Sequence, residues 1–519
     1  MKKTLLFMLG VSLANLMHAQ IYVDQTATGD NNGTSWDNAY VDLQDALTNA
    51  NPNDEIWVAQ GRYVPPQAGR FASFITQPSQ IGLKIYGGFN GIETALNQRD
   101  FRNNPTVLDG DKNGDDTPGV IDANNAFRQD NVYNVVLIQG DDVTIDGFTI
   151  ENGHANGNDL PQQNGAAIRK TQAPAKLTVK NCLITNNYAN TSAAGIFFWV
   201  DKVGSELIAE GNVFTNNRAQ WGTGIYAVLL DPNPTATMDV RVLGNLFAKN
   251  EAIGGNSLGA SALWVRGLAT QGIVDVDIIN NTIYNNVDNV LSNQGETRTT
   301  VGVDAVGTST ISTTYANNIN DNNADLSGTV ASNNIMTVLS GTYLGNEADV
   351  FINNNLTDVS FGGAADIPPA SLANNILGNP SYVDEANNDL NLVQGSLGID
   401  AGDNTSLPAG FTSDLAGNPR IVNTTVDAGA FEFQGNLSVS SLNKENFKLS
   451  FYPNPATDVL TINAENKKLT EISIFSLQGR KILQSKNNTV DVSKLQAGIY
   501  LVKAVSQEGI IMTKRFIKK

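Results

Sequence analysis

The sequence predicts an all-β protein: a parallel β-helix with an N-terminal capping helix, followed by a small C-terminal β-sandwich. Three observations lead to this prediction. A short asparagine phrase recurs at spacings of 31 to 36 residues, the segments between its copies lack a helical period, and the last 70 residues change to closely spaced alternating strands. A chain of 519 residues is long enough for a long solenoid and one further domain.

The repeated phrase places an apolar stretch between two asparagines. Its copies are Asn181–Asn186, Asn212–Asn216, Asn245–Asn250 and Asn281–Asn285, and Gly147–Asn152 is the same phrase with Gly in the first position. Such periods are typical of solenoids, in which each coil buries its apolar face against its neighbours. The copies therefore predict a stack of equivalent coils.

Asparagine suits two tasks in such a coil. It tolerates left-handed backbone at the corners between strands, and stacked amide side chains can form hydrogen bonds from coil to coil. We expect Asn212, Asn245 and Asn281 to stack in a file along the solenoid. The residues Phe214, Phe247 and Ile283 should then point into its core.

The segments between the phrases form short strands bounded by turns, such as 143–145, 176–179 and 274–278. A second short element recurs once per coil, at 167–168, 195–196, 224–225 and 262–263. Two or three short strands per coil without helices favour a parallel β-helix over an α-solenoid or a leucine-rich horseshoe. We assign residues 81–433 to this β-helix.

Residues 1–19 have a charged start, an apolar run and a small-residue cleavage site between Ala19 and Gln20. This pattern is typical of a secretory signal peptide. No later stretch reaches the roughly 18 apolar residues of a membrane helix, so we expect no transmembrane segment.

Residues 20–80 should form an N-terminal cap and the first strands. Trp36, Tyr40, Leu43 and Leu47 recur at helical spacing, which predicts an amphipathic helix over residues 34–50. A helix before the first strand can cover the open end of a solenoid, which would otherwise expose its core and its strand edges.

The C-terminal part of the chain has a different sequence pattern. Residues 434–446 are polar and are predicted to be a linker. Residues 447–519 contain alternating strands at short intervals, typical of an antiparallel β-sandwich of about seven strands.

The charge is divided unequally along the chain. Residues 20–436 carry 18 Lys and Arg against 45 Asp and Glu, whereas residues 437–519 carry 13 against 6. So acidic a body repels nucleic acid, and we expect a cation to bridge any acidic polysaccharide bound to it. The one cysteine, Cys182, excludes an internal disulfide and is expected to be a buried apolar residue. We expect a monomer.

One loop has the composition of a cation site. Asp109, Asp111, Asn113 and Asp115 place oxygen atoms at alternate positions, with Gly114 allowing a sharp turn. Ca²⁺ prefers six to eight hard oxygen ligands. The twelfth position is Val120 rather than Glu, so the loop is not an EF-hand. A structural Ca²⁺ site and a solvated polar turn are the two alternatives.

The last 70 residues resemble the C-terminal sorting domain of the type IX secretion system of Bacteroidetes. The matching phrases are 451–458, 474–480, 495–503 and 514–519, and they contain Pro453, Asn454, Pro455, Gly479, Gly498 and Tyr500. The resemblance implies a β-sandwich address tag that carries the protein across the outer membrane and is then usually removed. The secretion machinery would be a partner, and the protein would be secreted or held at the outer surface after passing through the periplasm.

Residues 20–433 resemble the secreted right-handed β-helix proteins of the pectin-lyase-like superfamily. The resemblance rests on entry phrases at 21–24, 33–36, 54–59 and 85–89 and on exit phrases at 414–420 and 427–432. It implies the fold but no particular activity.

A β-helix lyase needs a base, often Lys or Arg, and a group that neutralises the uronate carboxylate of its substrate. The weak candidates in the central coils are Arg169, Arg218, Arg241 and Arg266, with Trp221 and Tyr226 near Arg218 as a sugar-stacking platform. The alternative is that these are ordinary surface arginines and core aromatics. The motifs of polygalacturonases and pectate lyases are absent.

Two functions remain open. The first is a carbohydrate-binding or adhesive scaffold without catalysis, and the second is a polysaccharide lyase or glycoside hydrolase acting on an acidic polysaccharide. The missing motifs and the acidic body favour the first. Convergence of three or more of the four arginines with Asp or Glu in one groove would favour the second.

Overall fold

The structure, a computed structural model, describes residues 20–117, 119–171, 175–230, 236–253, 260–268, 272–289, 299–305, 309–325, 337–340, 350–357, 372–422, 424–435, 449–464, 468–476, 481–507 and 511–519. The signal segment 1–19, with Ala19, lies outside these residues, as do most of the linker and Gly479. Contacts within the chain separate two compact units, residues 1–434 and 435–519.

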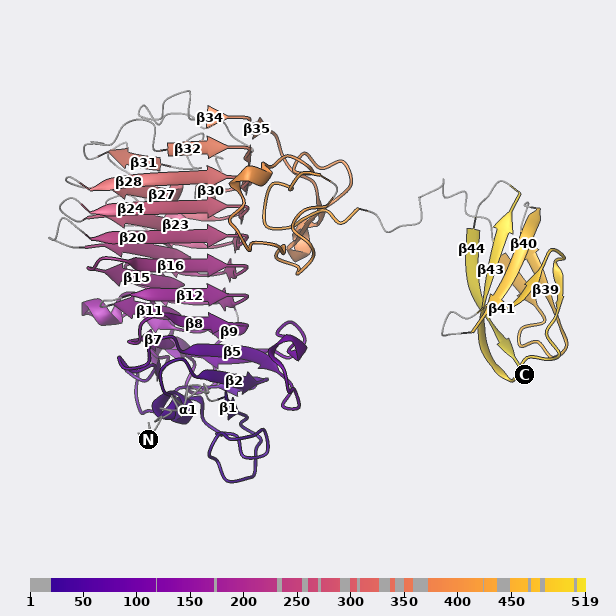
Figure 1. Cartoon of the computed structure of the whole chain (residues 1–519), viewed down its shortest axis with the longest axis horizontal. Helices are drawn as coiled ribbons and strands as arrows, with labels where there is room; N and C mark the ends of the chain where they lie inside the picture. The colour runs from indigo at the N-terminus through magenta and orange to yellow at the C-terminus, as the bar shows by residue number, and fades with distance from the viewer. Residues whose placement is uncertain are drawn as a thin grey trace, which may run out of the picture. The chain divides into compact units, whose positions relative to one another are not determined.

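The first unit is a stack of coils whose strands pair in parallel with the equivalent strands of the coils before and after (Figure 1). Each complete coil passes through four sheets in turn. In the described residues, sheet 1 consists of β1 (Gln20–Val23), β2 (Glu55–Ala59), β5 (Lys84–Phe89), β8 (Val143–Asp146), β12 (Lys176–Lys180), β16 (Ser205–Glu210), β20 (Thr237–Leu243), β24 (Ile273–Ile279), β28 (Thr310–Ala316), β32 (Val350–Asn353) and β34 (Leu372–Ala373).

Sheet 2 follows each strand of sheet 1 after a short corner. Its described strands are β3 (Gly61–Tyr63), β6 (Thr106–Asp109), β9 (Phe148–Glu151), β13 (Leu183–Thr185), β17 (Val213–Thr215), β21 (Leu246–Ala248), β25 (Thr282–Tyr284), β29 (Ile319–Asp321), β33 (Leu356–Thr357) and β35 (Ile376–Leu377).

Two more sheets complete the coil. The short strands of sheet 3 are β10 (His154–Ala155), β14 (Tyr188–Ala189), β18 (Arg218–Ala219), β22 (Glu251–Ile253), β26 (Val287–Asn289) and β30 (Ala324–Asp325). Sheet 4 consists of β4 (Phe74–Ile75), β7 (Val136–Ile138), β11 (Ile168–Thr171), β15 (Ile196–Val200), β19 (Ile225–Leu229), β23 (Ala260–Gly267), β27 (Thr299–Ala305) and β31 (Thr337–Ser340). The predicted parallel β-helix is confirmed, and the second recurrent element of the sequence is sheet 4.

The interior of the coils is apolar because side chains alternate between the two faces of each strand. Phe214, Phe247 and Ile283 are in register on β17, β21 and β25, and all three are fully buried. The predicted orientation of these residues is therefore confirmed. Cys182 is also buried, as expected, and burial raises the pKa of its thiol to about 12.

Asparagine side chains line two corners of the stack. Between sheets 1 and 2, the backbone N–H of Asn212 donates to Asn245 Oδ1 at 2.8 Å, and Asn245 donates likewise to Asn281 at 2.9 Å. The file continues through Asn318, Asn355 and Asn375. A second file between sheets 2 and 3 contains Asn187, Asn217, Asn250, Asn286 and Asn323. The predicted file is confirmed.

At each corner, the left-handed backbone and the hydrogen bond to the next coil are provided by two adjacent residues rather than by one asparagine. Asn181 has φ +53° and is equivalent to Gly211, which has φ +65°. The buried file position of that coil is held by Cys182, whose N–H donates to Asn212 Oδ1. Aligning Asn181 with Asn212 was therefore wrong by one residue.

The N-terminal end of the stack is covered by α1 (Leu43–Asn49), which buries Leu43, Ala46 and Leu47 and contacts β1, β2 and β4. Asp42 begins it by accepting a hydrogen bond from Gln44 N. The helix predicted over 34–50 is too long. The backbone of Tyr40 instead forms hydrogen bonds with Tyr22 and Asp24 at the edge of β1, so its N–H and C=O are already paired outside a helix. The other helical turns are η1 (Leu96–Gln98), η2 (Ala126–Gln129), η3 (Leu160–Gln162), η6 (Glu385–Asn387) and η7 (Asn404–Ser406).

Residues 378–434, the exit segment, lie against the outer face of sheet 2 (Figure 1). The segment contains the hairpin β36 (Tyr382–Asp384) and β37 (Asp389–Leu392) and buries apolar residues against Leu246, Tyr284 and Ile319. Its Leu415 accepts a hydrogen bond through its carbonyl from Arg102 Nη2 at 2.7 Å. The segment therefore contacts both late coils and the region before β6.

The second unit has its own core and two antiparallel sheets. Its described residues form one sheet from β38 (Leu449–Tyr452), β39 (Val459–Ala464) and β42 (Thr489–Asp491), and another from β40 (Leu469–Phe475), β41 (Lys481–Ser485), β43 (Gly498–Ser506) and β44 (Ile511–Lys518). Leu460, Ile474 and Phe516 are buried between them. The predicted β-sandwich of about seven strands is confirmed.

Candidate functional site

The outer face of sheet 4 carries a file of large side chains. Strand register places Arg169 beside Phe197, Phe197 beside Tyr226, and Tyr226 beside Trp264 on successive coils. The rings of Phe197 and Tyr226 are nearly parallel, with centroids 6.0 Å apart. This outer aromatic file arises because alternate residues of each strand point away from the apolar interior.

A second file runs beside the first. It contains Thr171, Trp199, Val228, Arg266 and Asp304. Arg266 is neutralised within it, because Nε and Nη2 donate to the two carboxylate oxygens of Asp304 at 2.8 Å each. Trp199 is only partly buried and lies 5.5 Å from Phe197 between ring centroids.

Members of both files line a cavity of about 490 Å³: Arg169 and Phe197 from the first, and Thr171 and Trp199 from the second. We call it the aromatic cavity, and its lining residues are Leu160, Asn164, Arg169, Thr171, Phe197, Trp199, Asp201 and Leu230. Aromatic and aliphatic groups form most of the wall, with one cation, one carboxylate and a few neutral polar groups. This composition is typical of sites for small organic ligands.

Arg169 is the unusual residue of the aromatic cavity. Its Nε is buried without a hydrogen-bond partner, and no ion pair joins it to another side chain in the described part of the chain. Burial lowers the pKa of Arg169. Across the cavity, Asp201 has one buried, unpartnered oxygen and lies 3.6 Å from Lys202 Nζ.

The four candidate arginines do not converge. Arg169 and Arg266 lie on sheet 4, Arg218 lies on β18 of sheet 3, and Arg241 is exposed on β20 of sheet 1. Different sheets face different directions around the coil, so the convergence that would favour an enzyme is not observed.

Arg218 is also not beside the predicted stacking platform. Its Nη1 donates to Ile121 O at 3.0 Å, and its Nε lies 3.0 Å from a carboxylate oxygen of Glu251. Trp221 and Tyr226 belong to the aromatic cluster of sheet 4 instead. The proximity of Arg218 and Trp221 in sequence was misleading, because a corner of the coil separates them.

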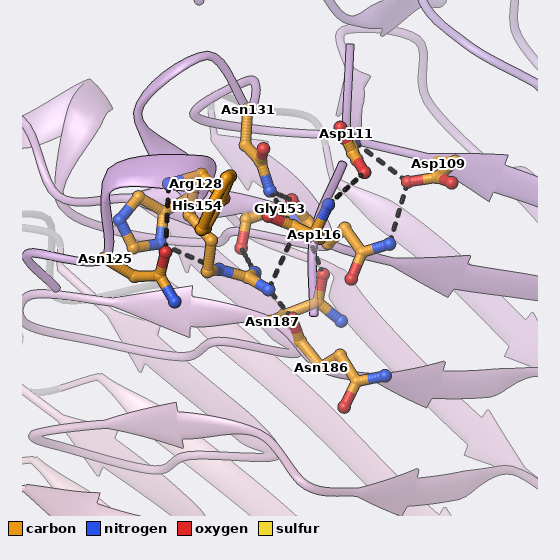
Figure 2. A network of polar contacts seen from close by, with 12 residues as sticks. Asp109, Asp111, Asp116, Asn125, Arg128, Asn131, Gly153, His154, Asn186 and Asn187 are labelled. Carbon is orange, nitrogen blue, oxygen red and sulfur yellow. Dashed lines mark hydrogen bonds and ion pairs between the residues drawn. The ribbon is translucent and has the colours of Figure 1, made fainter. Parts of the chain in front are cut away.

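A polar network surrounds the predicted calcium loop (Figure 2). Asp109 Oδ2 lies 2.6 Å from Arg62 Nε, and Asp109 Oδ1 accepts from Asp111 N and Asn152 Nδ2. Both oxygens of Asp109 are therefore already engaged. The side chain of Asn113 is exposed.

The deeper part of this network centres on Arg128, which is almost completely buried. Its Nη1 lies 3.0 Å from Asp116 Oδ2, and its Nη2 donates to Asn186 O at 2.8 Å (Figure 2). Burial raises the pKa of Asp116 to about 6, although Arg128 opposes the shift. Burial also lowers the pKa of His154 to about 3, with Arg128 adding to this effect, so His154 is neutral.

Of the four predicted metal ligands, the structure brings two together with a residue that was not predicted. Oxygen atoms of Asp111, Asp115 and Asp116 lie within 4.8 Å of one another, whereas Asp109 forms an ion pair with Arg62. Asp116 could have been found from the sequence, because it directly follows Asp115 in the same acidic loop.

The described residues of the predicted sorting motif, which exclude Gly479, include three that contact β44: Asn454, Gly498 and Tyr500. Asn454 Oδ1 accepts from Ile517 N at 2.9 Å, and Pro453 and Pro455 flank it. Gly498 begins β43, and the ring of Tyr500 stacks on Phe516 at 5.7 Å while its hydroxyl donates to Gln496 O. Asn454 therefore joins the start of the second unit to its last strand, and Tyr500 packs on that strand.

Residues 450–519 match the family profile described as secretion system C-terminal sorting domain. The second unit is a sorting domain. Its presence shows that the protein is a substrate of the secretion machinery, exported from the cell or to its outer surface. Among the described residues, no helix is both long enough and apolar enough to cross a bilayer.

The crystal structure of pectate lyase Pel9A is similar to this chain, with a TM-score of 0.34 and 13% sequence identity, over 80% of this chain and 96% of that one. No curated protein matches the sequence.

Phe197 and Trp199 were missed by sequence reasoning. The segment Ile196-Phe-Phe-Trp-Val200 contains a usable signal, because strict alternation buries Ile196, Phe198 and Val200 and turns Phe197 and Trp199 outward.

Proposed function

We propose that the exported β-helix binds a polysaccharide in the aromatic cavity and acts as a carbohydrate-binding or adhesive scaffold. One observation carries this proposal: a partly exposed tryptophan, Trp199, lies in a 490 Å³ cavity with an arginine that has no ion-pair partner among the described residues. A flat ring can pack against the apolar face of a sugar, while the neighbouring polar groups bind its hydroxyls.

Arg169 supports an acidic sugar as the ligand. A half-buried cation is costly unless an anion pairs with it, and guanidinium binds carboxylate in a bidentate manner. The body carries 45 acidic and 18 basic residues, so a cation that lines a cavity without an ion pair is a local site for an anion. A uronate carboxylate would supply the missing partner without requiring a cation bridge.

Export follows a two-step route in this proposal. The N-terminal signal peptide, residues 1–19, directs the chain to the periplasm, and the sorting domain then takes it across the outer membrane. The body reaches the polysaccharide outside the cell.

Binding is tested by affinity electrophoresis of the protein in gels that contain polygalacturonate, alginate or a neutral glucan. We expect retardation by an acidic polymer, lost in Trp199→Ala and in Arg169→Gln. The matched controls are Phe71→Ala, an exposed aromatic outside the cavity, and Arg241→Gln, an exposed arginine on sheet 1. Equal retardation of all four variants would contradict binding in the aromatic cavity.

A polysaccharide lyase is the second candidate, because Arg169 lies in the aromatic cavity and arginine can serve as the base of a β-helix lyase. A lyase removes the proton α to a uronate carboxylate, and burial, which lowers the pKa of Arg169, makes its neutral, basic form more accessible. The test is the appearance of unsaturated uronate ends, followed by absorbance. If the protein forms these unsaturated ends and Arg169→Gln does not, the protein is a lyase rather than a non-catalytic scaffold.

A further inference from the structure

One loop of the first unit crosses several coils. We call residues 110–131 the strap, because they leave β6 and lie against strands of sheet 3 before β7 begins. The carbonyl of Ala123 lies 3.2 Å from His154 Nε2, Arg128 donates to Asn186 O, and the carbonyl of Ile121 accepts from Arg218. The described residues of the strap therefore contact three successive coils.

The strap holds more negative charge than its neighbours neutralise. Oxygen atoms of Asp111, Asp115 and Asp116 lie within 4.8 Å of one another. Arg128 forms an ion pair with one oxygen of Asp116, at 3.0 Å, and is the one side chain that does so for these three carboxylates within the described residues. Asp130 lies close by, where its Oδ2 accepts from Asn113 N.

A separate observation concerns two buried oxygens. Asp116 Oδ1 and Asn131 Oδ1 are both buried and have no hydrogen-bond partner. The side chain of Asp116 is 6% exposed and Asn131 is 0% exposed. Asn131 Nδ2 donates to Asp116 Oδ2 at 2.7 Å, so this amide is held against the carboxylate (Figure 2).

Buried oxygens without donors are rare, because burial removes the water that would otherwise bind them. Arg128 and Asn131 both bind Asp116 Oδ2, and the N–H of Asp116 donates to Asp111 Oδ2 at 3.1 Å. No described residue donates to Oδ1, so this oxygen is available to a bound cation.

We propose that Asp111, Asp115 and Asp116 bind one Ca²⁺ ion, with Asp116 Oδ1 as the buried ligand and Asn131 Oδ1 as a further oxygen beside it. The ligand set consists of oxygen only, which suits a hard cation. Backbone carbonyls and water would complete the six to eight positions that Ca²⁺ takes. The ion holds the strap in place and so couples the three coils that the strap contacts.

The test is calorimetric titration of the full chain with CaCl₂ after removal of metals by chelator, combined with thermal unfolding with and without Ca²⁺. We expect binding at this site and a higher Tm with Ca²⁺. Asp115→Asn, at an exposed position whose side chain has no hydrogen bond to the described residues, should weaken binding roughly tenfold or more and reduce the Tm rise. Asp116→Asn should abolish both.

The matched control is Asp37→Asn, an exposed aspartate in the N-terminal cap, which should behave like the parent. If Asp116→Asn does not fold, Asp115→Asn alone decides the question. Absence of Ca²⁺ binding, or equal binding by the parent and Asp115→Asn, would overturn the proposal. Binding of Mg²⁺ with no binding of Ca²⁺ would overturn the assignment to calcium.

Discussion

Phe214 and Phe247 stack face to face on adjacent coils, with ring centroids 4.7 Å apart and planes 3° from parallel. Their strands are in parallel register, and Ile184 and Ile283 hold the equivalent positions in the coils before and after. Each coil thus adds one side chain to a continuous interior column, and both faces of that side chain are covered by its neighbours.

Truncation of this column should be costly. Phe247→Ala removes a fully buried ring between two packed neighbours, so we expect it to lower the free energy of unfolding by roughly 3–5 kcal/mol. Chemical denaturation measures the loss. Arg241→Ala, on the exposed face of sheet 1, should cost less than about 0.5 kcal/mol. Equal stability of the two variants would mean that the column does not support the stack.

The asparagine file makes a second stability prediction. Asn245 Nδ2 donates to Ala209 O and to Asn281 Oδ1, and Asn245 Oδ1 accepts from Asn212 N. Asn245→Ala leaves these buried groups without partners and should cost roughly 2–4 kcal/mol. Asn245→Asp, which removes the donors and buries a charge, should cost more.

The measurement for the asparagine file is again the denaturation midpoint, with Asn90→Ala as the control. Asn90 is exposed and its side chain binds only Gln60 among the described residues, so its loss should be nearly neutral. A milder effect of Asn245→Asp than of Asn245→Ala would argue against the file as a hydrogen-bonded structure.

The sorting domain should be needed for export but not for folding of the β-helix. The two units have separate hydrophobic cores, so a chain ending at Gln434 should keep the β-helix intact. We expect that truncated chain to show a cooperative unfolding transition and to accumulate in the periplasm. Cell fractionation compares it with the intact chain, and its appearance outside the cell in normal amounts would refute a sorting role.

Glu151 makes a prediction about pH. Glu151 on β9 is the strand-register partner of Asp109 on β6. Burial raises the pKa of Glu151 to about 7, the negative charge of Asp109 adds to the shift, and Arg62 opposes it. Between pH 4.5 and 7 the folded protein therefore keeps a proton that the unfolded chain releases. The stabilisation is complete below pH 4.5 and is lost as the pH rises towards 7.

Glu151→Gln stays neutral at every pH, so the difference in Tm between this variant and the parent should increase in favour of the variant as the pH rises from 5 to 8. Thermal unfolding of both proteins in chelator, across that range, isolates the contribution of Glu151 from that of Asp116. Parallel pH profiles would show that Glu151 is ionised throughout.

The fold was predictable because its repeating features are local. The asparagine phrases mark the corners of each coil, and the period-two strands between them mark the sheets, as at Lys176–Lys180. The N-terminal helix shows the limit of this approach. Trp36 has the correct helical spacing, yet its indole donates to Glu93 O and its ring packs on Tyr22, contacts that depend on the folded chain.

The candidate site was harder to predict, because the direction of a side chain depends on the corners of the coil. Arg218 and Trp221 are three residues apart but lie on different sides of a corner. Arg169 and Trp199 are 30 residues apart but meet in one cavity, since one coil separates them. Sequence distance within a coil is therefore a poor guide, and the register between coils is required.

The hydrogen bond from Arg102 to Leu415 closes a chain loop of 313 residues. A protein fixed to a surface by its C-terminal end is pulled through Gln434, and the load enters through the exit segment. That segment is bonded to Asn280 and Thr282 on one coil and to Asn317 on the next, besides Arg102. Its apolar residues also pack on Leu246, Tyr284, Ile319 and Leu356, which lie on successive coils. Tension is therefore shared as shear across several coils at once, where a bare solenoid would peel apart from its last coil inward.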